Sequence, residues 1–213
     1  MAKPKYSTIL LRGWSTIVLF GILGLVLAVV LSFLRPLEYS STIRLLVIEN
    51  VGSVDAYTAA RSSERIAEDL ATITHTTSFY DKVMDAGFAI DEEYFPEDDY
   101  KRRNEWEKTV STTVARGTGL LTIKVYHEDV AQAEQIAHAV AFVLTNEGWT
   151  YTSGSNSTIR LVDEPLNSRW PVRPNIPANA FAGLVLGGLL GVAYVILQTE
   201  RIRRRHQLID EDF

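Results

Sequence analysis

Two long apolar stretches, one near each end of the chain, dominate the pattern of hydrophobic and polar positions. The first runs from Trp14 to Leu34 and the second from Ile176 to Leu197, and neither contains a charged residue. Since a helix rises about 1.5 Å per residue, each stretch is long enough to cross a hydrocarbon layer about 30 Å thick. The pattern therefore predicts two transmembrane helices. Arg35 and Pro36 follow the first stretch without an Ala-x-Ala cleavage site, which favours a retained anchor over a cleaved signal peptide.

The segment between the two stretches has the alternation and periodicity of a domain that mixes strands and helices. Branched residues and alternating polarity predict strands at residues 41–48, 110–115, 120–126 and 157–163. Apolar residues at helical spacing predict helices at residues 55–73, 78–86 and 130–148. A fourth helix, at residues 101–108, is predicted from its polar composition. We expect Ser78 and Asp81 to form a capping box, and Asp129 to cap the last helix.

The main elements follow the order strand, helix, strand, strand, helix, strand, which is that of a split βαβ, ferredoxin-like fold. The predicted fold class is thus α+β, with two transmembrane helices flanking a ferredoxin-like (βαββαβ) extracytoplasmic domain. Because the first and last strands connect directly to the two apolar stretches, we expect them to be neighbours at the centre of the sheet.

Basic residues outside the apolar stretches predict the orientation of the chain. They are Lys3, Lys5, Arg12, Arg201, Arg203, Arg204 and Arg205. Lys and Arg near the ends of membrane spans favour the cytoplasmic side. We therefore expect a multi-pass protein of the cell (inner) membrane, with both termini cytoplasmic and the central domain periplasmic or extracellular. The expected segments are a cytoplasmic N-terminus (1–13), a first span (14–34), an extracytoplasmic domain (35–164), a proline-rich strut (165–175), a second span (176–197) and a cytoplasmic tail (198–213).

Charge and composition argue against several functions. Between Arg35 and Arg173 there are 14 Lys and Arg residues against 22 Asp and Glu residues, so this segment would repel a nucleic acid. The chain has no cysteine, which excludes a disulfide framework and a thiolate metal site. Its four histidines are scattered, no nucleophile motif is present, and neither apolar stretch carries an ionisable group. We expect neither an enzyme nor a bound cofactor; for the acidic run 91–99 a calcium site is the alternative to a solvated loop.

Two further features each have two interpretations. Gly183, Gly187 and Gly191 recur at four-residue spacing, which indicates either a seam where another helix packs or the ordinary frequency of glycine in membrane helices. Gly21 and Gly24 would provide a matching patch on the first span. The tail is either a docking peptide for a partner or a frayed end whose arginines only set topology. Its candidate docking residues are Arg201, Arg203, Arg204, Arg205, Leu208, Ile209 and Phe213.

Several local motifs resemble the polysaccharide co-polymerases, the Wzz-type chain-length determinant family, across essentially the whole chain. Trp14 opens the first span, and its exit reads Pro36-Leu-Glu-Tyr39-Ser-Ser. The long helix is preceded by Ile123-Lys-Val-Tyr-His-Glu-Asp129. Glu164-Pro165 is followed by Pro171-Val-Arg-Pro174-Asn-Ile-Pro177, which enters a glycine-rich span. These prolines would keep the segment extended as a stiff strut, the alternative being a helix-breaking linker.

The resemblance implies a homo-oligomer, ring-like in the family, that acts with a polysaccharide polymerase or export machinery and regulates the polymerisation, chain length and export of a surface glycan. The chain lacks a long helical arm between Gly87 and Val110 and a fused kinase domain. It therefore resembles the short form, whose partner can be a separate cytoplasmic tyrosine kinase. The alternatives are a receptor or adaptor that activates such a kinase through its tail, and a structural membrane scaffold.

Overall fold

A computed structural model describes residues 10–49, 56–152 and 157–210, with side chains up to Arg201. The chain forms two compact units. One contains the two ends of the chain, Met1–Pro36 and Arg173–Phe213, and the other is Leu37–Val172. The boundary on the C-terminal side lies within the predicted proline-rich strut. Each unit has its own packing, and the two are described in turn.

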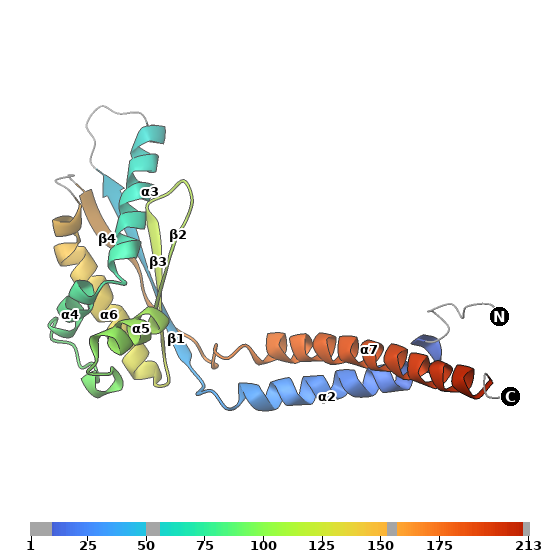
Figure 1. Ribbon diagram of the computed structural model, residues 1–213. Coiled ribbons are helices and arrows are strands. Elements are labelled where there is room, and N and C mark those ends of the chain that lie inside the picture. Colours follow the sequence, from blue (N-terminus) through green and yellow to red (C-terminus); the bar gives the residue numbers. More distant parts are fainter. Residues whose placement is uncertain (1–9, 50–55, 153–156, 211–213) are drawn as a thin grey trace. The chain divides into compact units, whose positions relative to one another are not determined.

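A four-stranded antiparallel sheet forms the centre of the unit Leu37–Val172 (Figure 1). Its strands are β1 (Tyr39–Glu49), β2 (Val110–Val114), β3 (Leu120–His127) and β4 (Ser157–Asn167), in the order β2-β3-β1-β4. All four predicted strands are present. As expected, β1 and β4 are neighbours, but β4 lies at the edge and not at the centre of the sheet. The reason is that β1 has only two edges: the β2–β3 hairpin takes one and β4 takes the other, and no further strand in the described ranges pairs with β4.

Two long helices cover one face of the sheet. They are α3 (Ala56–Ile73) and α6 (Val130–Glu147), and both contact β1. Along β1, Ile43, Leu45 and Val47 are buried, whereas the alternate residue Arg44 is exposed. Successive strand residues point to opposite faces, so this pattern means that only one face is covered. The predicted long helices are therefore confirmed.

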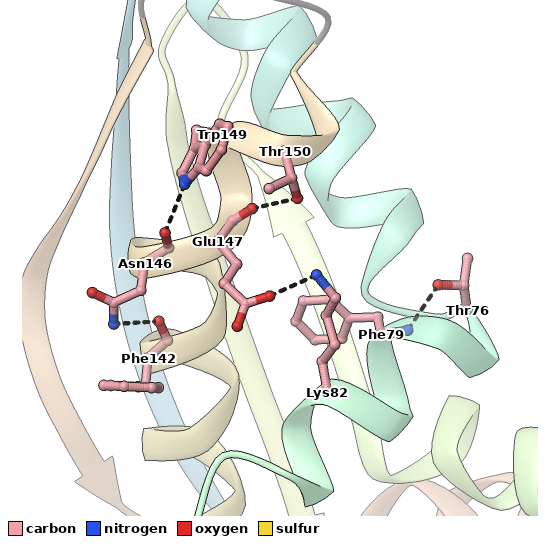
Figure 2. Close-up of polar contacts among 8 residues, drawn as sticks. All are labelled: Thr76, Phe79, Lys82, Phe142, Asn146, Glu147, Trp149 and Thr150. Atoms are coloured by element: carbon pink, nitrogen blue, oxygen red, sulfur yellow. Dashed lines mark hydrogen bonds and ion pairs between the residues drawn. The ribbon is translucent and has the colours of Figure 1, made fainter.

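Helix caps follow the sequence in one case and depart from it in another. Asp129 caps α6 as predicted, accepting a hydrogen bond from the Ala131 amide at 2.8 Å. The shorter helix α4 (Thr77–Met84) is capped by Thr76, whose hydroxyl accepts from the Phe79 amide at 3.3 Å (Figure 2). The predicted capping box at Ser78 is therefore wrong, because Thr76 already has the extended backbone that an N-cap requires.

An ion pair links α4 to the end of α6 (Figure 2). The Lys82 ammonium donates to the Glu147 carboxylate at 2.6 Å and lies 5.0 Å from the centre of the Tyr151 ring. The hydrogen bond to Glu147 raises the pKa of Lys82 above its usual value. Because both side chains are partly exposed to solvent, the ion pair contributes little to the free energy of folding. Its main effect is to orient α4 relative to α6. A short 3₁₀ turn, η2 (Gly148–Tyr151), follows α6 and leaves Trp149 exposed.

The final strand continues beyond the predicted boundary. β4 extends to Asn167 and so includes Pro165, the first residue of the predicted strut. The pairing with β1 shifts register between Thr42 and Arg44, opposite the stretch that contains Pro165. Proline cannot donate to a ladder of hydrogen bonds, but an edge strand with an irregular register tolerates it. The extended segment after the domain is therefore shorter than the proline pattern suggested.

The acidic segment 91–99 is more ordered than the predicted loop. It contains the 3₁₀ turn η1 (Glu92–Tyr94) and leads into α5 (Asp99–Thr109). Asp91 caps η1 by accepting from Glu93, and Asp98 caps α5 by accepting from the Lys101 amide. These two carboxylates therefore stabilise helix starts. The charged side chains remain outside, while one aromatic residue of the segment, Phe95, is buried.

A buried aromatic cluster fixes α4, the acidic segment and α5 to one another. Tyr80, Phe95 and Trp106 lie with their ring centres 5.2 to 5.9 Å apart in edge-to-face arrangements. The Trp106 side chain is 1% exposed, and its Nε1 donates to the Thr74 carbonyl at 2.7 Å. Burial of this indole, together with a satisfied donor, makes Trp106 the main anchor of the peripheral helices.

We expect Trp106→Ala to lower the unfolding free energy of the fragment 37–172 by about 3–5 kcal/mol, because it leaves a cavity and an unpaired carbonyl. Trp170→Ala is the matched control: Trp170 is 79% exposed, and its removal should cost less than about 0.5 kcal/mol. Denaturant unfolding followed by circular dichroism measures both. Equal losses in the two variants would contradict the anchor role.

Candidate functional site: the paired apolar helices

The other unit consists of two long helices packed against each other. They are α2 (Trp14–Ser32) and α7 (Ile176–Asp210). By length and composition both are able to cross a membrane, over Trp14–Phe33 and Ile176–Arg201. Leu19, Leu23 and Leu189 are each more than 60% exposed. Apolar side chains at this density on the outside of a helix pair need a nonaqueous environment or a covering partner.

The two helices run antiparallel and approach through glycine. Gly183 on α7 faces Gly24 and Ala28 on α2, and a Cβ atom at Gly183 would lie 2.5 Å from both the Ala28 Cβ and the Gly24 carbonyl oxygen. A Cβ atom at Gly24 would lie 2.9 Å from the Gly187 Cα. Any side chain at these positions would collide with backbone, so the glycines permit an unusually close approach.

The same contact extends toward the N-terminal end of α2. A Cβ atom at Gly187 would collide with the Phe20 carbonyl oxygen, and one at Gly191 would lie 2.9 Å from the Ile17 Cα. The rings of Phe20 and Tyr194 stack with centres 5.3 Å apart. We refer to Gly24, Gly183, Gly187 and Gly191 as the glycine seam. Gly21 contributes less, because its nearest neighbours are at ordinary van der Waals distance, 3.6 Å or more.

A polar contact joins the helices at the opposite end of the pair. The Asn179 side-chain amide donates to the Ser32 hydroxyl at 2.9 Å, and that hydroxyl donates to the Ala28 carbonyl at 2.8 Å. Ser32 is only 3% exposed. A buried hydroxyl with both a donor and an acceptor partner costs little, and an interhelical hydrogen bond in an apolar setting contributes about 1 kcal/mol.

The proline-rich motif is divided between several elements. Pro165 lies in β4, and Pro171 lies between β4 and the end of the domain unit. Pro177 is the second residue of α7, where a missing amide hydrogen is tolerated, and the Asn175 side chain accepts from the Ala178 amide there. Of the other predicted residues, Pro36 is the last residue before the domain unit, Pro174 precedes α7, and Tyr39 is the first residue of β1, opposite His127.

The predicted tail continues the second apolar helix. α7 extends to Asp210, so Arg201, Arg203, Arg204, Arg205, Leu208 and Ile209 all belong to one helix. Arg201 is exposed. The side chains from residue 202 onward, and Phe213 altogether, lie outside the described residues. The helix passes the predicted end of the span because Leu197-Gln-Thr-Glu-Arg-Ile-Arg contains no helix breaker.

A shallow depression of about 360 Å³ in the domain unit is lined by His75, Arg103 and Thr112 among others. The His75 Nε2 atom lies 3.0 Å from the Thr112 hydroxyl, which in turn donates to the Ala71 carbonyl. This chain of hydrogen bonds connects the end of α3 to β2. Burial lowers the pKa of His75, and the nearby Glu107 carboxylate opposes that shift only in part. Burial thus favours the neutral form of His75, whose ring contacts β2 through Thr112.

Other candidate chemistry is sparse in the described part of the chain. Within residues 10–49, 56–152 and 157–201, no group of three or more His, Asp or Glu side chains is placed to hold a metal ion. Comparison of the sequence with protein-family models and with curated proteins gave no match. Among the described residues, the helix pair is therefore the feature that best supports a functional proposal.

The sequence pattern predicts the glycines of α7 as a packing surface, but it does not predict the polar contact at one end of the helix pair. Ser32, Arg35 and Asn179 come together there, around the start of the glycine seam. The available signal was an asparagine three residues inside an otherwise apolar helix, since polar side chains in such helices are costly unless they have a partner. The partner itself could not be identified without the packing of α2 on α7.

The glycine seam provides a matched test. We expect Gly187→Leu to force the helices apart toward the separation of about 8–10 Å that is usual between larger side chains, and Gly188→Leu to leave them in place. A Cβ atom at Gly188, the next residue along α7, would meet no atom of the other helix within 4 Å. The chain has no cysteine, so Phe20→Cys with Tyr194→Cys gives a clean background for a short bifunctional thiol reagent. Cross-linking should fall several-fold in Gly187→Leu only.

His75 gives the domain a specific pH dependence. Its folded pKa lies below the unfolded value of about 6.5, so below that pH the unfolded chain takes up a proton that the folded domain does not. Stability should therefore fall as the pH drops below about 6.5, and His75→Gln should weaken this dependence. His138→Gln, at a partly exposed position on α6, should retain it. Denaturation midpoints of the fragment 37–172 at pH values from about 7.5 down to about 5.5 measure the difference.

Proposed function

We propose that this protein is a membrane-anchored assembly protein of the polysaccharide co-polymerase type, which regulates the polymerisation, chain length and export of a surface polysaccharide. The observation that carries the proposal is the pair of apolar helices, one from each end of the chain, that pack through glycine and bracket an α+β domain. Such a pair suits a membrane anchor. Most of the motifs that resemble the family lie near the ends of these helices, and one, Ile123–Asp129, lies inside the domain before α6.

The proposed location is the cell membrane, with both termini cytoplasmic and the domain on the outer side. The exposed leucines of α2 and α7 support insertion of both helices, because the lipid would cover them. The basic residues near the two chain ends support the orientation. The strand order β2-β3-β1-β4, with helices on one face, supports assignment of the domain to the split βαβ, ferredoxin-like class.

In this proposal the protein acts by assembly and not by catalysis. Copies of the chain form a homo-oligomer beside a polysaccharide polymerase or the export machinery, and the chemistry belongs to that partner. The uninterrupted continuation of α7 to Asp210 supports a second role for the tail. A helical extension bearing several arginines suits docking of a separate cytoplasmic tyrosine kinase, which is the receptor or adaptor alternative.

The test is complementation of a strain that lacks the gene. We expect deletion to change the length distribution of a cell-surface glycan, resolved on a gel, and wild-type protein to restore it. Gly188→Leu should restore it as well, whereas Gly187→Leu should not, because only the latter disrupts the helix pair. Sizing of the protein in mild detergent should show an oligomer.

Three outcomes would contradict parts of the proposal. Unchanged glycan lengths after deletion would exclude the polysaccharide role and favour a structural scaffold. Tags that place the domain inside intact cells, or either terminus outside, would exclude the topology. Loss of phosphorylation of a partner kinase on removal of residues 208–213, with normal glycan lengths, would favour the receptor alternative.

A further inference from the structure

A groove of about 320 Å³ lies between the end of α2 and the start of α7. Ser32, Arg35 and Asn179 line one part of it, and Leu31, Ala182 and Leu186 line another. This volume is at the lower end of the range of about 300–1,000 Å³ that is usual for ligand pockets. The groove is contained wholly within the helix unit. Gly183, one residue of the glycine seam, also lines the groove.

The polarity of the groove changes along the helices. Arg35 lies just beyond the end of α2, and Ser32 and Asn179 are about one turn further in. Ala28, one turn beyond Ser32, and Leu186, about two turns beyond Asn179, are apolar. A shallow surface groove with a cation at one end and apolar side chains along its length has the same order of polarity as a phospholipid, with its headgroup at one end and its acyl chain at the other.

Arg35 is the fixed charge at one end of the groove. No carboxylate lines the groove, and Arg35 forms no ion pair with any residue that the structure describes. The dipole of α2 ends where that of α7 begins, so the two oppose each other and largely cancel. The guanidinium therefore sets the sign of the local potential, and its planar donors suit a phosphate group.

Asn179 adds a second polar contact. One of its amide hydrogens bonds to Ser32, and its side chain is otherwise exposed toward the groove. We propose that this groove binds an anionic phospholipid of the outer leaflet, with the phosphate at Arg35 and Asn179 and an acyl chain along Leu31, Ala182 and Leu186. The inference rests on the proposed insertion of both helices in the membrane, and it is independent of the polysaccharide role.

The test uses the full-length protein in nanodiscs that contain a phosphatidylglycerol or a phosphatidylcholine probe with a photoreactive group on the acyl chain. Mass spectrometry maps the cross-linked residues. We expect the phosphatidylglycerol probe to label the peptides around Leu31 and Ala182 about fivefold more than the phosphatidylcholine probe, the ratio expected for one arginine and an anionic headgroup. Arg35→Gln should abolish this preference and Arg35→Lys should retain most of it.

Arg201→Gln is the matched control, because it removes an exposed arginine from the other end of the same helix pair and should leave labelling of the groove unchanged. Equal labelling by the two probes in the wild-type protein would overturn the proposal and show only bulk lipid around the helices. A preference that survives Arg35→Gln would also overturn it. Failure of the protein to enter nanodiscs at all would contradict membrane insertion, a result distinct from loss of lipid preference.

Discussion

The close approach of α2 and α7 along the glycine seam is the constraint on which the helix unit depends. Helices of this length expose a great deal of apolar surface, and nothing about hydrophobicity alone would hold two such helices in one register inside a lipid. Backbone contact at Gly24 and Gly187, with the Ser32–Asn179 hydrogen bond near one end, defines both register and direction. The groove exists because Gly183 and Ala182 provide no bulk to fill it.

In each of the two units, the first element along the chain packs against the last. In the helix unit the chain leaves along α2 and returns along α7, and these two elements pair. In the domain unit the chain enters along β1 and leaves along β4, and these strands pair as well. Elements far apart in the sequence thus become neighbours twice. Both units therefore depend on contacts between segments that are far apart in the sequence.

Some elements were predictable because their signal is local. The strand at 120–126 has clear alternation, the hairpin turn before it contains Gly117 with φ of +71°, and Asp129 immediately precedes an apolar helix stripe. Thr76 shows where local signals fail. Ser78 had the right residue type and spacing for a capping box, yet the backbone of Thr76 decided where α4 begins. The restricted φ of Pro165 predicts a strut, and only the register shift between β1 and β4 lets this residue lie in a strand.

Residue type and short-range spacing are enough to locate the apolar helices, the alternation of core residues along the strands, and the glycines on one face of α7. The position of β4 at the edge of the sheet, and the meeting of Ser32, Arg35 and Asn179 beside the seam, instead depend on long-range packing. Arg35 and Asn179 lie near opposite ends of the chain, and their proximity depends on how two backbones pack. Spacing along one helix contains no information about which face of another helix lies opposite.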